Sequence, residues 1–279
     1  MMTLSPFVLA IVLGSAVLHA GWNVAVRAQH DRRRETALVV VGAATLCVLI
    51  LPFLPAPARA SWPYLAASGV LHVAYFILIA EAYSRGGVSL AYPLMRGTAP
   101  VLTAVVASAV IGEALSVWGW LGIAGISTGV VLMAKRTGDP AEARAIPFAL
   151  GNAVVIAAYT LNDALGARAS GSPVAYTLWV EPLSLVPSLF WLLRGQVVRL
   201  PNLREMLRGL GGGGSSMGAY AIALWAMTVA PIAPVAALRE TSMLFAVALA
   251  WVFLGERPGP RGWAAAGVIA LGAAVMRFG

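Results

Sequence analysis

The stretch MRGTAPVLTAVVASAVIGEALSVWGWLGIAGISTGVVLM, residues 95–133, occurs twice in this chain in related form. A shift of 143 positions places it, without a gap, on LRETSMLFAVALAWVFLGERPGPRGWAAAGVIALGAAVM, residues 238–276. A bias toward Ala, Gly and Leu produces chance matches among small residues, but it does not readily align Arg, Gly-Glu and Trp in one register. The sequence therefore predicts an internal repeat. The matched positions are Arg96 and Arg239, Thr98 and Thr241, Gly112-Glu113 and Gly255-Glu256, Gly119-Trp120 and Gly262-Trp263, Gly129 and Gly272, and Met133 and Met276.

The composition excludes an ordinary soluble domain. Of the 279 residues, 60% are hydrophobic and 11% are charged, and the mean hydropathy is +0.84. A soluble domain is roughly 45–50% apolar and about 25% charged, so this chain has too few charges to cover a surface that faces water. A membrane-spanning helix needs about 20 residues, and the length therefore holds roughly ten spans joined by short loops.

Apolar runs separated by charge, Pro or Gly predict an all-α, polytopic membrane protein with ten transmembrane helices. The runs are continuous, whereas the strands of a membrane β-barrel alternate in segments of about ten residues. Lipid offers no hydrogen-bond partner to unpaired backbone groups, which favours helices further. The predicted helices are 5–26, 36–54, 62–84, 88–112, 116–134, 146–168, 173–193, 207–229, 232–254 and 260–277.

The repeat divides these helices into two sets of five. We expect a first repeat over residues 1–136, a connecting loop over 137–145 and a second repeat over 146–279. Because each set holds an odd number of spans, the second copy enters the membrane upside down. Inverted repeats are typical of transporters, in which two halves rock about a site near the middle of the bilayer. We therefore expect a solute-sized hollow between the halves.

Several of these segments resemble the EamA-type drug/metabolite transporter superfamily. The resemblance is carried by YSRGGVSLAYPLMRGTAP at 83–100 with IGE at 111–113, and by its counterpart AALRETS at 236–242 with LGE at 254–256. The opening HAGWN at 19–23 is similar to first helices of that group. The resemblance covers essentially the whole chain, and the paired Gly-Glu endings are its most specific part.

The resemblance implies ten helices in two inverted five-helix halves, transport without ATP hydrolysis, and small metabolites as cargo. One branch of the superfamily exports amino acids, including aromatic ones, although no motif in this chain fixes that branch. The family arrangement also implies that both termini lie in the cytoplasm.

The distribution of Lys and Arg predicts the opposite orientation. The connections after the first, third, fifth, seventh and ninth predicted helices carry fourteen of the 19 basic residues. The other side, termini included, carries three: Arg59, Arg168 and Arg277. Because basic loops remain in the cytoplasm, we expect both termini outside.

Two arginines, Arg96 and Arg239, lie within the fourth and ninth predicted helices. An Arg at depth costs about 2.5–3.5 kcal/mol on insertion scales, so it normally faces a cavity or a partner. One interpretation places one or both beside the transport pathway, where a guanidinium binds an anionic group such as a substrate carboxylate. The other is a buried ion pair, with Glu240, Glu181 or Asp163 as the partner.

Aromatic and polar side chains share one face on each of several predicted helices, at spacings of three or four residues. Rings with a polar edge suit amphipathic small molecules, because they supply contact area and a few orienting hydrogen bonds. Alternatively, the His and Asn side chains link helices and the Tyr and Trp side chains form an interfacial belt. Besides the two arginines, the candidate cavity residues are His19, Trp22, Asn23, His72, Tyr75, Ile79, Tyr83, Tyr92, Tyr159 and Asn162.

Four prolines interrupt apolar runs: Pro93 and Pro100 in the fourth predicted helix, and Pro182 and Pro187 in the seventh. Proline removes a backbone donor and kinks a helix, and bent helices in transporters line the cavity or act as hinges. We therefore treat these four as candidate hinges. The alternative is that proline is simply commoner in membrane helices.

Small residues predict close packing between the fifth and tenth helices. Gly122, Gly125 and Gly129 give the fifth helix a flat face, and Gly267 and Gly272 do the same for the tenth. The same faces are compatible with a dimer contact, but packing within one chain is favoured. We interpret the two matched Gly-Glu pairs, at 112–113 and 255–256, as turn residues that close each helix onto the next.

Other chemistries find no support in the sequence. The GxSxG pattern of residues 125–129 lies inside an apolar helix, whereas a nucleophile elbow needs a strand-turn-helix context. The glycine run 209–214 resembles a phosphate loop but lacks the lysine and the preceding strand, so we interpret it as a flexible entry to the eighth helix. The chain has no Walker sequence and no zinc-type spacing, so we expect no cofactor, no metal and no enzymatic activity.

The net charge of +8 comes from arginines that are scattered through loops. Because basic residues bind phosphate when they gather on one exposed surface, this distribution argues against nucleic-acid binding.

The sequence thus predicts a secondary transporter of the cell inner membrane that moves small organic metabolites by alternating access. Export of amino acids, including aromatic ones, is the favoured activity. The partners expected are a small-molecule substrate and membrane lipid, and the chain is expected to act as a monomer. The alternatives are an importer or flippase of another polar metabolite, or an intramembrane enzyme.

Overall fold

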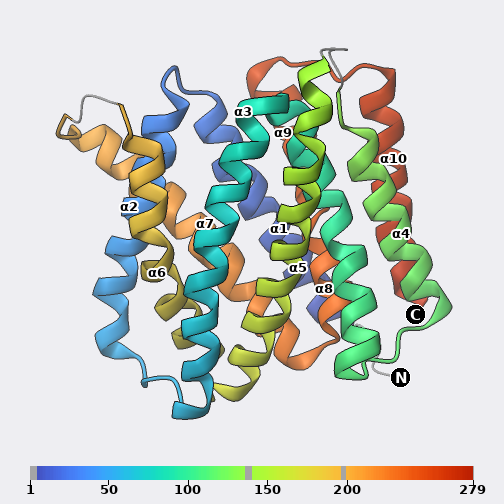
Figure 1. Ribbon diagram of the computed structural model, residues 1–279, viewed down its shortest axis with the longest axis horizontal. Coiled ribbons are helices and arrows are strands. Elements are labelled where there is room, and N and C mark those ends of the chain that lie inside the picture. Colours follow the sequence, from blue (N-terminus) through green and yellow to red (C-terminus); the bar gives the residue numbers. More distant parts are fainter. Residues whose placement is uncertain (1–4, 136–139, 196–198, 279) are drawn as a thin grey trace.

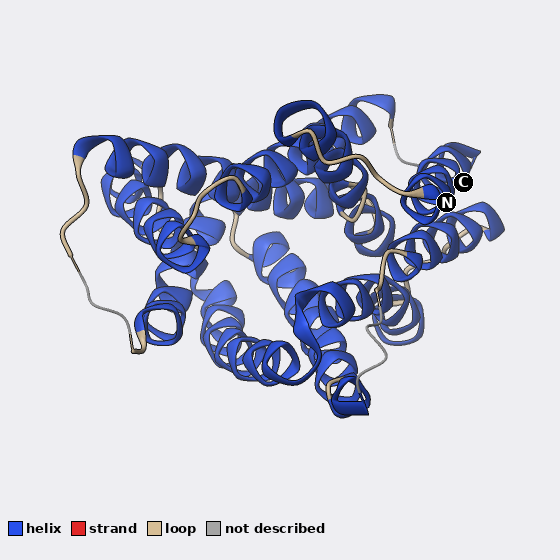
Figure 2. Cartoon of the chain, turned by 90° about the horizontal axis from the view of Figure 1, so that it is seen from above, coloured by secondary structure: helices blue, strands red, loops and turns tan. Residues whose placement is uncertain are grey.

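The computed structural model describes residues 5–135, 140–195 and 199–278, and all secondary structure in this part of the chain is helical (Figure 2). This agrees with the predicted all-α class. The α-helices are α1 Pro6–Arg27, α2 Arg32–Ile50, α3 Trp62–Val106, α4 Val117–Leu132, α5 Ile146–Ala169, α6 Pro173–Leu193, α7 Leu203–Val229, α8 Ile232–Arg239, α9 Ser242–Leu254 and α10 Pro260–Val275. Short 3₁₀ turns occupy Leu51–Phe53, Arg59–Ser61, Pro140–Arg144 and Met276–Phe278, and a π-helical turn occupies Ala107–Ile111.

The predicted and observed helices differ mainly at their ends and at two breaks. α3 continues through the predicted turn after residue 84, but Gly87 leaves the helical conformation there, with a φ of 66°. The predicted helix 232–254 is divided into α8 and α9 by a turn at Glu240 and Thr241. Of the predicted connecting loop, residues 137–139 lie outside the described part, and the remainder contains the 3₁₀ turn that precedes α5.

α2 and α7 begin four residues before their predicted starts because polar caps extend them. The Asp31 side chain accepts a hydrogen bond from the Arg34 backbone N–H at the start of α2. At the start of α7, the Asn202 side chain and the Glu205 carboxylate each bind the other's backbone N–H, which forms a capping box. Glu205 precedes the predicted span 207–229. The hydrogen bond from the Asn202 backbone N–H, and to a smaller extent the one from the Arg34 side chain, lower the pKa of the Glu205 carboxyl to about 2.

α4 and α10 pack against each other in opposite directions, as the glycine pattern predicts. Gly122 lies against Met276, and further along α4, Gly129 lies against Ile269. Figure 1 shows the two helices side by side, with α4 beginning at the lower end of the view and α10 ending there. Gly272 contacts the α4 backbone closely, whereas Gly267 has open space around it and plays no part in this contact.

The glycine run 209–214 is not a flexible entry to a helix. It lies inside α7, whose backbone packs directly onto α2. Gly209 lies against the carbonyl of Leu38, and Gly213 lies against the backbone of Gly42 and Ala43, so α2 and α7 run in the same direction. The run is helical because the absence of side chains lets two backbones approach, and this contact compensates for the poor helix propensity of Gly.

The remaining contacts repeat between the two halves, which we define as α1–α4 and α5–α10. α1 of the first half packs against α7 and α9, and α5 of the second half packs against α3. In Figure 1, α1 and α5 are traversed in opposite directions, as expected for an inverted repeat. The described chain is therefore an all-helical protein built from two related, inverted sets of helices.

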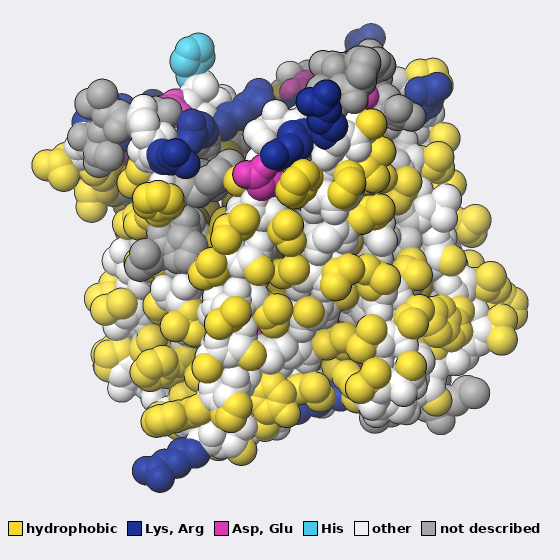
Figure 3. All heavy atoms as spheres, viewed as in Figure 1, with side chains coloured by type: hydrophobic (Ala, Val, Ile, Leu, Met, Phe, Trp, Pro, Cys, Tyr) yellow, Lys and Arg dark blue, Asp and Glu magenta, His cyan; other side chains and the backbone are white. Residues whose placement is uncertain are grey.

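The outer surface is that of a membrane protein. Figure 3 shows hydrophobic side chains over the middle of the visible face, with Lys and Arg gathered along its upper rim and few at the lower edge. How many helices cross the bilayer stays a prediction. Among the described residues, five helical stretches are long and apolar enough to do so: Pro6–Arg27, Arg32–Phe53, Arg59–Ile111, Glu142–Ala169 and Ile232–Leu254.

Candidate functional site

A bidentate ion pair connects the two halves near the middle of the fold. The Arg96 guanidinium on α3 donates to both carboxylate oxygens of Glu240, at 2.9 Å from Nε and 2.8 Å from Nη2. The side chains are only 11% and 6% exposed. Of the alternatives that the sequence left open for Arg96, the buried ion pair with Glu240 is the observed one. Glu240 lies in the turn between α8 and α9, so this pair holds α3 against that turn.

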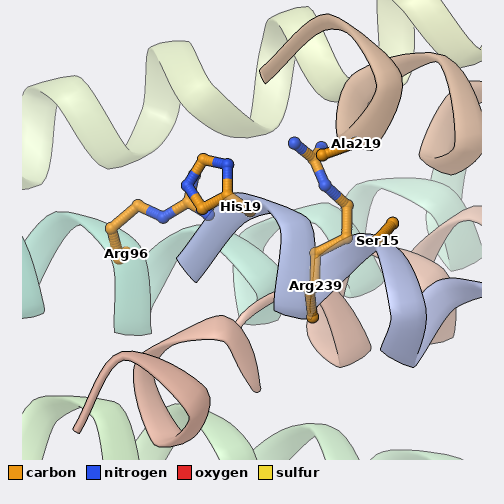
Figure 4. A pocket seen from close by; sticks show the side chains of 6 residues that line it. Ser15, His19, Arg96, Ala219 and Arg239 are labelled. Carbon is orange, nitrogen blue, oxygen red and sulfur yellow. The ribbon is translucent and has the colours of Figure 1, made fainter. Parts of the chain in front are cut away.

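A narrow hollow lies beside this pair, between α1, α3, α7 and α8. Figure 4 shows His19 between the side chains of Arg96 and Arg239. The hollow contains about 190 Å³ of empty space, but it is too narrow for a water-sized sphere to fit freely. Among the described residues, the hollow beside this ion pair is therefore narrower than the solute-sized hollow that the sequence predicted. Its lining residues are Ser15, Ala16, His19, Arg96, Ala219 and Arg239.

Arg239, at the end of α8, has different surroundings from its repeat partner. Its guanidinium carbon lies 5.2 Å from the centre of the Tyr220 ring, in a cation–π arrangement. Within the described part of the chain, no carboxylate oxygen lies at ion-pair distance from Arg239. Behind the ring, the Tyr220 hydroxyl donates to Asp163 at 2.6 Å. Asp163 is fully buried and also accepts from the Tyr176 hydroxyl at 3.2 Å.

The repeat explains why the two arginines differ. The register that pairs Arg96 with Arg239 pairs Gly97 with Glu240, so only the second half carries a carboxylate at this position. A side chain at position 97 is excluded by packing, because a Cβ there would approach the Ser127 carbonyl oxygen on α4 to 2.9 Å. Two guanidinium groups therefore line the hollow, and Arg96 is the one that is directly paired with a carboxylate.

An aromatic cluster adjoins the ion pair on the side of α3 and α5. The His72 ring stacks on Tyr159 with 4.9 Å between ring centres, and Tyr75 meets Tyr159 edge to face at 6.0 Å. Tyr75, Tyr92 and Tyr159 are close enough to Arg96 to interact with its charge. Ile79 and Tyr83 belong to the same packed group of side chains. The structure thus brings together aromatic candidates from three predicted helices, 62–84, 88–112 and 146–168.

Three other candidates, Asn23, Asn162 and Trp22, make contacts with neighbouring residues. The Asn23 side chain donates to the His19 carbonyl of its own helix at 2.7 Å. The Asn162 side chain donates to the Tyr64 carbonyl on α3 at 2.8 Å, which links two helices. Trp22 meets the His19 ring edge to face at 5.4 Å, and its Nε1 is buried without a partner in the described residues.

The candidate hinge prolines lie within helices that continue past them. Pro93 and Pro100 are buried in α3, and Gly87 is the position inside that helix with non-helical φ and ψ. α6 runs through positions 182 and 187 without a break. Whether these prolines act as hinges stays a prediction.

Sequence reasoning did not single out Ser15, Ala219 or Tyr220 as site residues. Ser15 precedes His19 by one turn of α1, and that spacing is the signal that identifies it. Tyr220 and Ala219 lie just beyond the glycine run on α7, where no polar pattern marks the face that meets α1. Only the packing of α7 against α1 shows that Ala219 borders the hollow.

Comparisons with known proteins agree with this arrangement. A search of curated proteins finds no match to this chain. A solved crystal structure of a protein is similar over 98% of this chain and 96% of its own, with a TM-score of 0.73 and 17% sequence identity, which shows a shared fold. The model of the EamA-like transporter family matches twice, over residues 6–135 and 143–278. This chain, with its two inverted sets of helices, therefore belongs to the EamA-like transporter family and is a multi-pass membrane transporter of the drug/metabolite type.

Proposed function

We propose that this transporter moves small organic metabolites that carry a carboxylate, with amino acids, including aromatic ones, as the favoured cargo, and that it does so by alternating access in the direction of export. The observation that carries the proposal is the pair of matched arginines that line one hollow between the halves, of which Arg96 is directly paired with a carboxylate and Arg239 is not. A substrate carboxylate supplies the missing partner for Arg239 and binds it in a bidentate manner.

The surroundings of the arginines favour an amino acid over a simple inorganic anion. Glu240 is the carboxylate nearest in the chain to Arg239 and interacts with both arginines, and it offers an acceptor for a substrate ammonium group. The stacked rings of His72 and Tyr159 form an aromatic wall beside Arg96. Such a wall supplies contact area for an aromatic or apolar side chain.

The closed hollow fits this function if binding and release need the halves to separate. The empty space of about 190 Å³ is too constricted for a free amino acid. Alternating access provides the movement, because the two inverted halves can rock about the site between them. The direction of export rests on the resemblance to a superfamily in which one branch exports amino acids, although no motif in this chain fixes that branch.

The test is counterflow of radiolabelled amino acids into proteoliposomes that contain the full chain. We expect Arg239→Gln to lower flux by about tenfold or more, since it removes a charged hydrogen-bonding partner of the carboxylate. Arg239→Lys should retain part of the flux, because it keeps the charge but loses the bidentate geometry. Arg59→Gln, at an exposed arginine outside the site, is the matched control and should transport normally.

The outcomes separate the candidates. Counterflow of amino acids that disappears in Arg239→Gln and persists in Arg59→Gln supports the proposal. Counterflow of other polar metabolites, with amino acids inert, would replace it by uptake or flipping of another metabolite. Normal amino-acid flux in both Arg96→Ala and Arg239→Ala would contradict the assigned site. Accumulation against a gradient in inside-out vesicles, compared with right-side-out vesicles, gives the direction.

A further inference from the structure

The two Gly-Glu corners, at 112–113 and 255–256, have the same backbone geometry. Gly112 and Gly255 end their helices in the left-handed conformation, with φ of 79° and 69°. The backbone N–H of the following glutamate then bonds the carbonyl six residues earlier, Ala107 for Glu113 and Ala250 for Glu256. This bond reaches one residue further back than the 6→1 bond of a Schellman motif. Together with the left-handed glycine, it ends the helix in the same way at both corners.

Each corner glutamate binds an arginine from the opposite half. Glu256, in the second half, pairs with Arg27 at the end of α1, at 2.6 Å. Glu113, in the first half, pairs with Arg168 near the end of α5, at 2.9 Å. α1 and α5 are the first helices of their halves, so the two pairs are repeats of one contact. They lie at opposite ends of the fold, because the corners precede the antiparallel helices α4 and α10.

The two pairs are not equally closed. At one end, Arg168 and Glu113 are 28% and 10% exposed. Arg168 also donates to the carbonyls of Met227 and Ala230, and Glu113 accepts the backbone N–H of Ile232 at the start of α8. At the other end, Arg27 and Glu256 are 53% and 44% exposed and are held by their mutual contact.

We propose that these two ion pairs are the gates of the transport pathway, one at each end, and that they break alternately as the halves rock. This deepens the alternating-access function proposed above and rests on it. A pair that joins opposite halves at one end holds that end shut, and its repeat does the same at the other end. The unequal burial indicates which end opens first from this conformation. The end with the buried Glu113–Arg168 pair stays closed, and the end with the exposed Arg27–Glu256 pair opens.

The test measures which end is open, without needing a known substrate. A cysteine is placed in the hollow as Ser15→Cys, after the single cysteine of the sequence is removed by Cys47→Ser. Its reaction with a membrane-impermeant thiol reagent is followed from each face of the membrane, in right-side-out and inside-out vesicles. Glu256→Gln should raise labelling from the Arg27 face by about 2- to 5-fold, as expected for loss of an exposed ion pair. Glu113→Gln should raise labelling from the opposite face by about tenfold or more, since it removes buried charged hydrogen bonds.

Matched variants separate gating from general damage. Glu81→Gln removes an ion pair of similar exposure that lies within one helix, between Glu81 and Arg85, and should leave labelling unchanged. The exchange of charges in Arg27→Glu with Glu256→Arg should restore labelling to that of the parent. If the two pairs are gates, Glu256→Gln raises labelling from the Arg27 face and Glu113→Gln raises labelling from the opposite face. Equal changes from both faces, no change with either glutamate, or failure of the exchange to restore labelling would overturn the proposal.

The experiments test the proposed gates and the proposed substrate site independently. If labelling responds as expected but amino-acid counterflow is absent, the gates stand and the assigned cargo is wrong. If counterflow depends on Arg239 but labelling does not depend on Glu113 and Glu256, the site stands and the gates are wrong.

Discussion

At the scale of single residues, the buried ion pair between Arg96 and Glu240 makes a testable contribution to the stability of the fold. Removing one partner of a buried ion pair leaves an uncompensated charge, whereas removing both leaves neutral groups. We therefore expect Arg96→Gln to lower the free energy of unfolding by about 3–5 kcal/mol. Combining Arg96→Gln with Glu240→Gln should recover most of that loss.

The measurement is thermal unfolding of the purified variants in one detergent, with the unfolding midpoint of each compared with the parent. Arg59→Gln, at an exposed arginine, serves as the neutral reference. A double variant that is less stable than either single variant would show that the pair is not energetically coupled in this way. Flux should stay low in the double variant, since the site has lost a guanidinium.

The sequence predicted these residues only in part. The repeat register located both arginines, because Arg is rare inside apolar helices. It left three partners open for them, since choosing among Glu240, Glu181 and Asp163 requires the packing of helices far apart in the chain. Asn162 shows the same limit, because its bond to a backbone carbonyl on α3 has no signature in the sequence.

At the scale of helices, the glycine run on α7 provides a sharp test of packing. Gly213 lies against the backbone of Gly42 and Ala43, while Gly211, half a turn away, has open space around it. We expect Gly213→Ala to destabilise the protein by about 1–3 kcal/mol, since the added methyl group overpacks the contact. Gly211→Ala should be neutral or stabilise by about 0.5–1 kcal/mol, because Ala is the better helix former.

Each variant adds one methyl group to the same helix, at a different position, which makes them a matched pair for thermal unfolding in detergent. If both raise stability, α7 does not pack closely on α2. If both lower it, the run tolerates no side chain on either face, and the open space beside Gly211 is filled in the membrane.

Helix positions were largely predictable, and helix breaks were not. Apolar runs located the helices, whereas the turn at Glu240 and Thr241 lies inside the stretch 232–254 that was predicted as one helix. The glycine run was misinterpreted because Gly is a poor helix former in isolation. Backbone contact with α2 outweighs that propensity, and only the folded structure shows the contact.

At the scale of the whole molecule, the charge asymmetry across the membrane predicts orientation. Figure 3 shows Lys and Arg concentrated at the rim opposite the chain termini of Figure 1. Because basic loops are retained in the cytoplasm, a reporter fused after residue 279 and active only outside the cytoplasm should give signal in a bacterial inner membrane. A second reporter, active only in the cytoplasm, is the control, and activity of that one would reverse the orientation.

The fold was more predictable than the site for a physical reason. Helix formation and membrane insertion depend on local apolar runs, and inversion follows from an odd number of spans in each repeat. The width of the hollow depends on how closely the two halves pack against each other. That packing involves ion pairs between residues far apart in the sequence. The sequence predicted a solute-sized hollow, whereas the hollow beside the Arg96–Glu240 pair is narrow in the described part of the chain.

The mismatch between Gly97 and Glu240 bears on how such a protein can arise. Two identical five-helix chains assembled as a dimer would place the same residue at both positions, giving either two carboxylates or none. Fusion into one polypeptide lets the copies diverge, and here the divergence fixes an odd number of charges at the centre. A symmetric dimer of either copy alone would present a different set of charges at this position, so the single carboxylate of Glu240 depends on the two copies being joined in one chain.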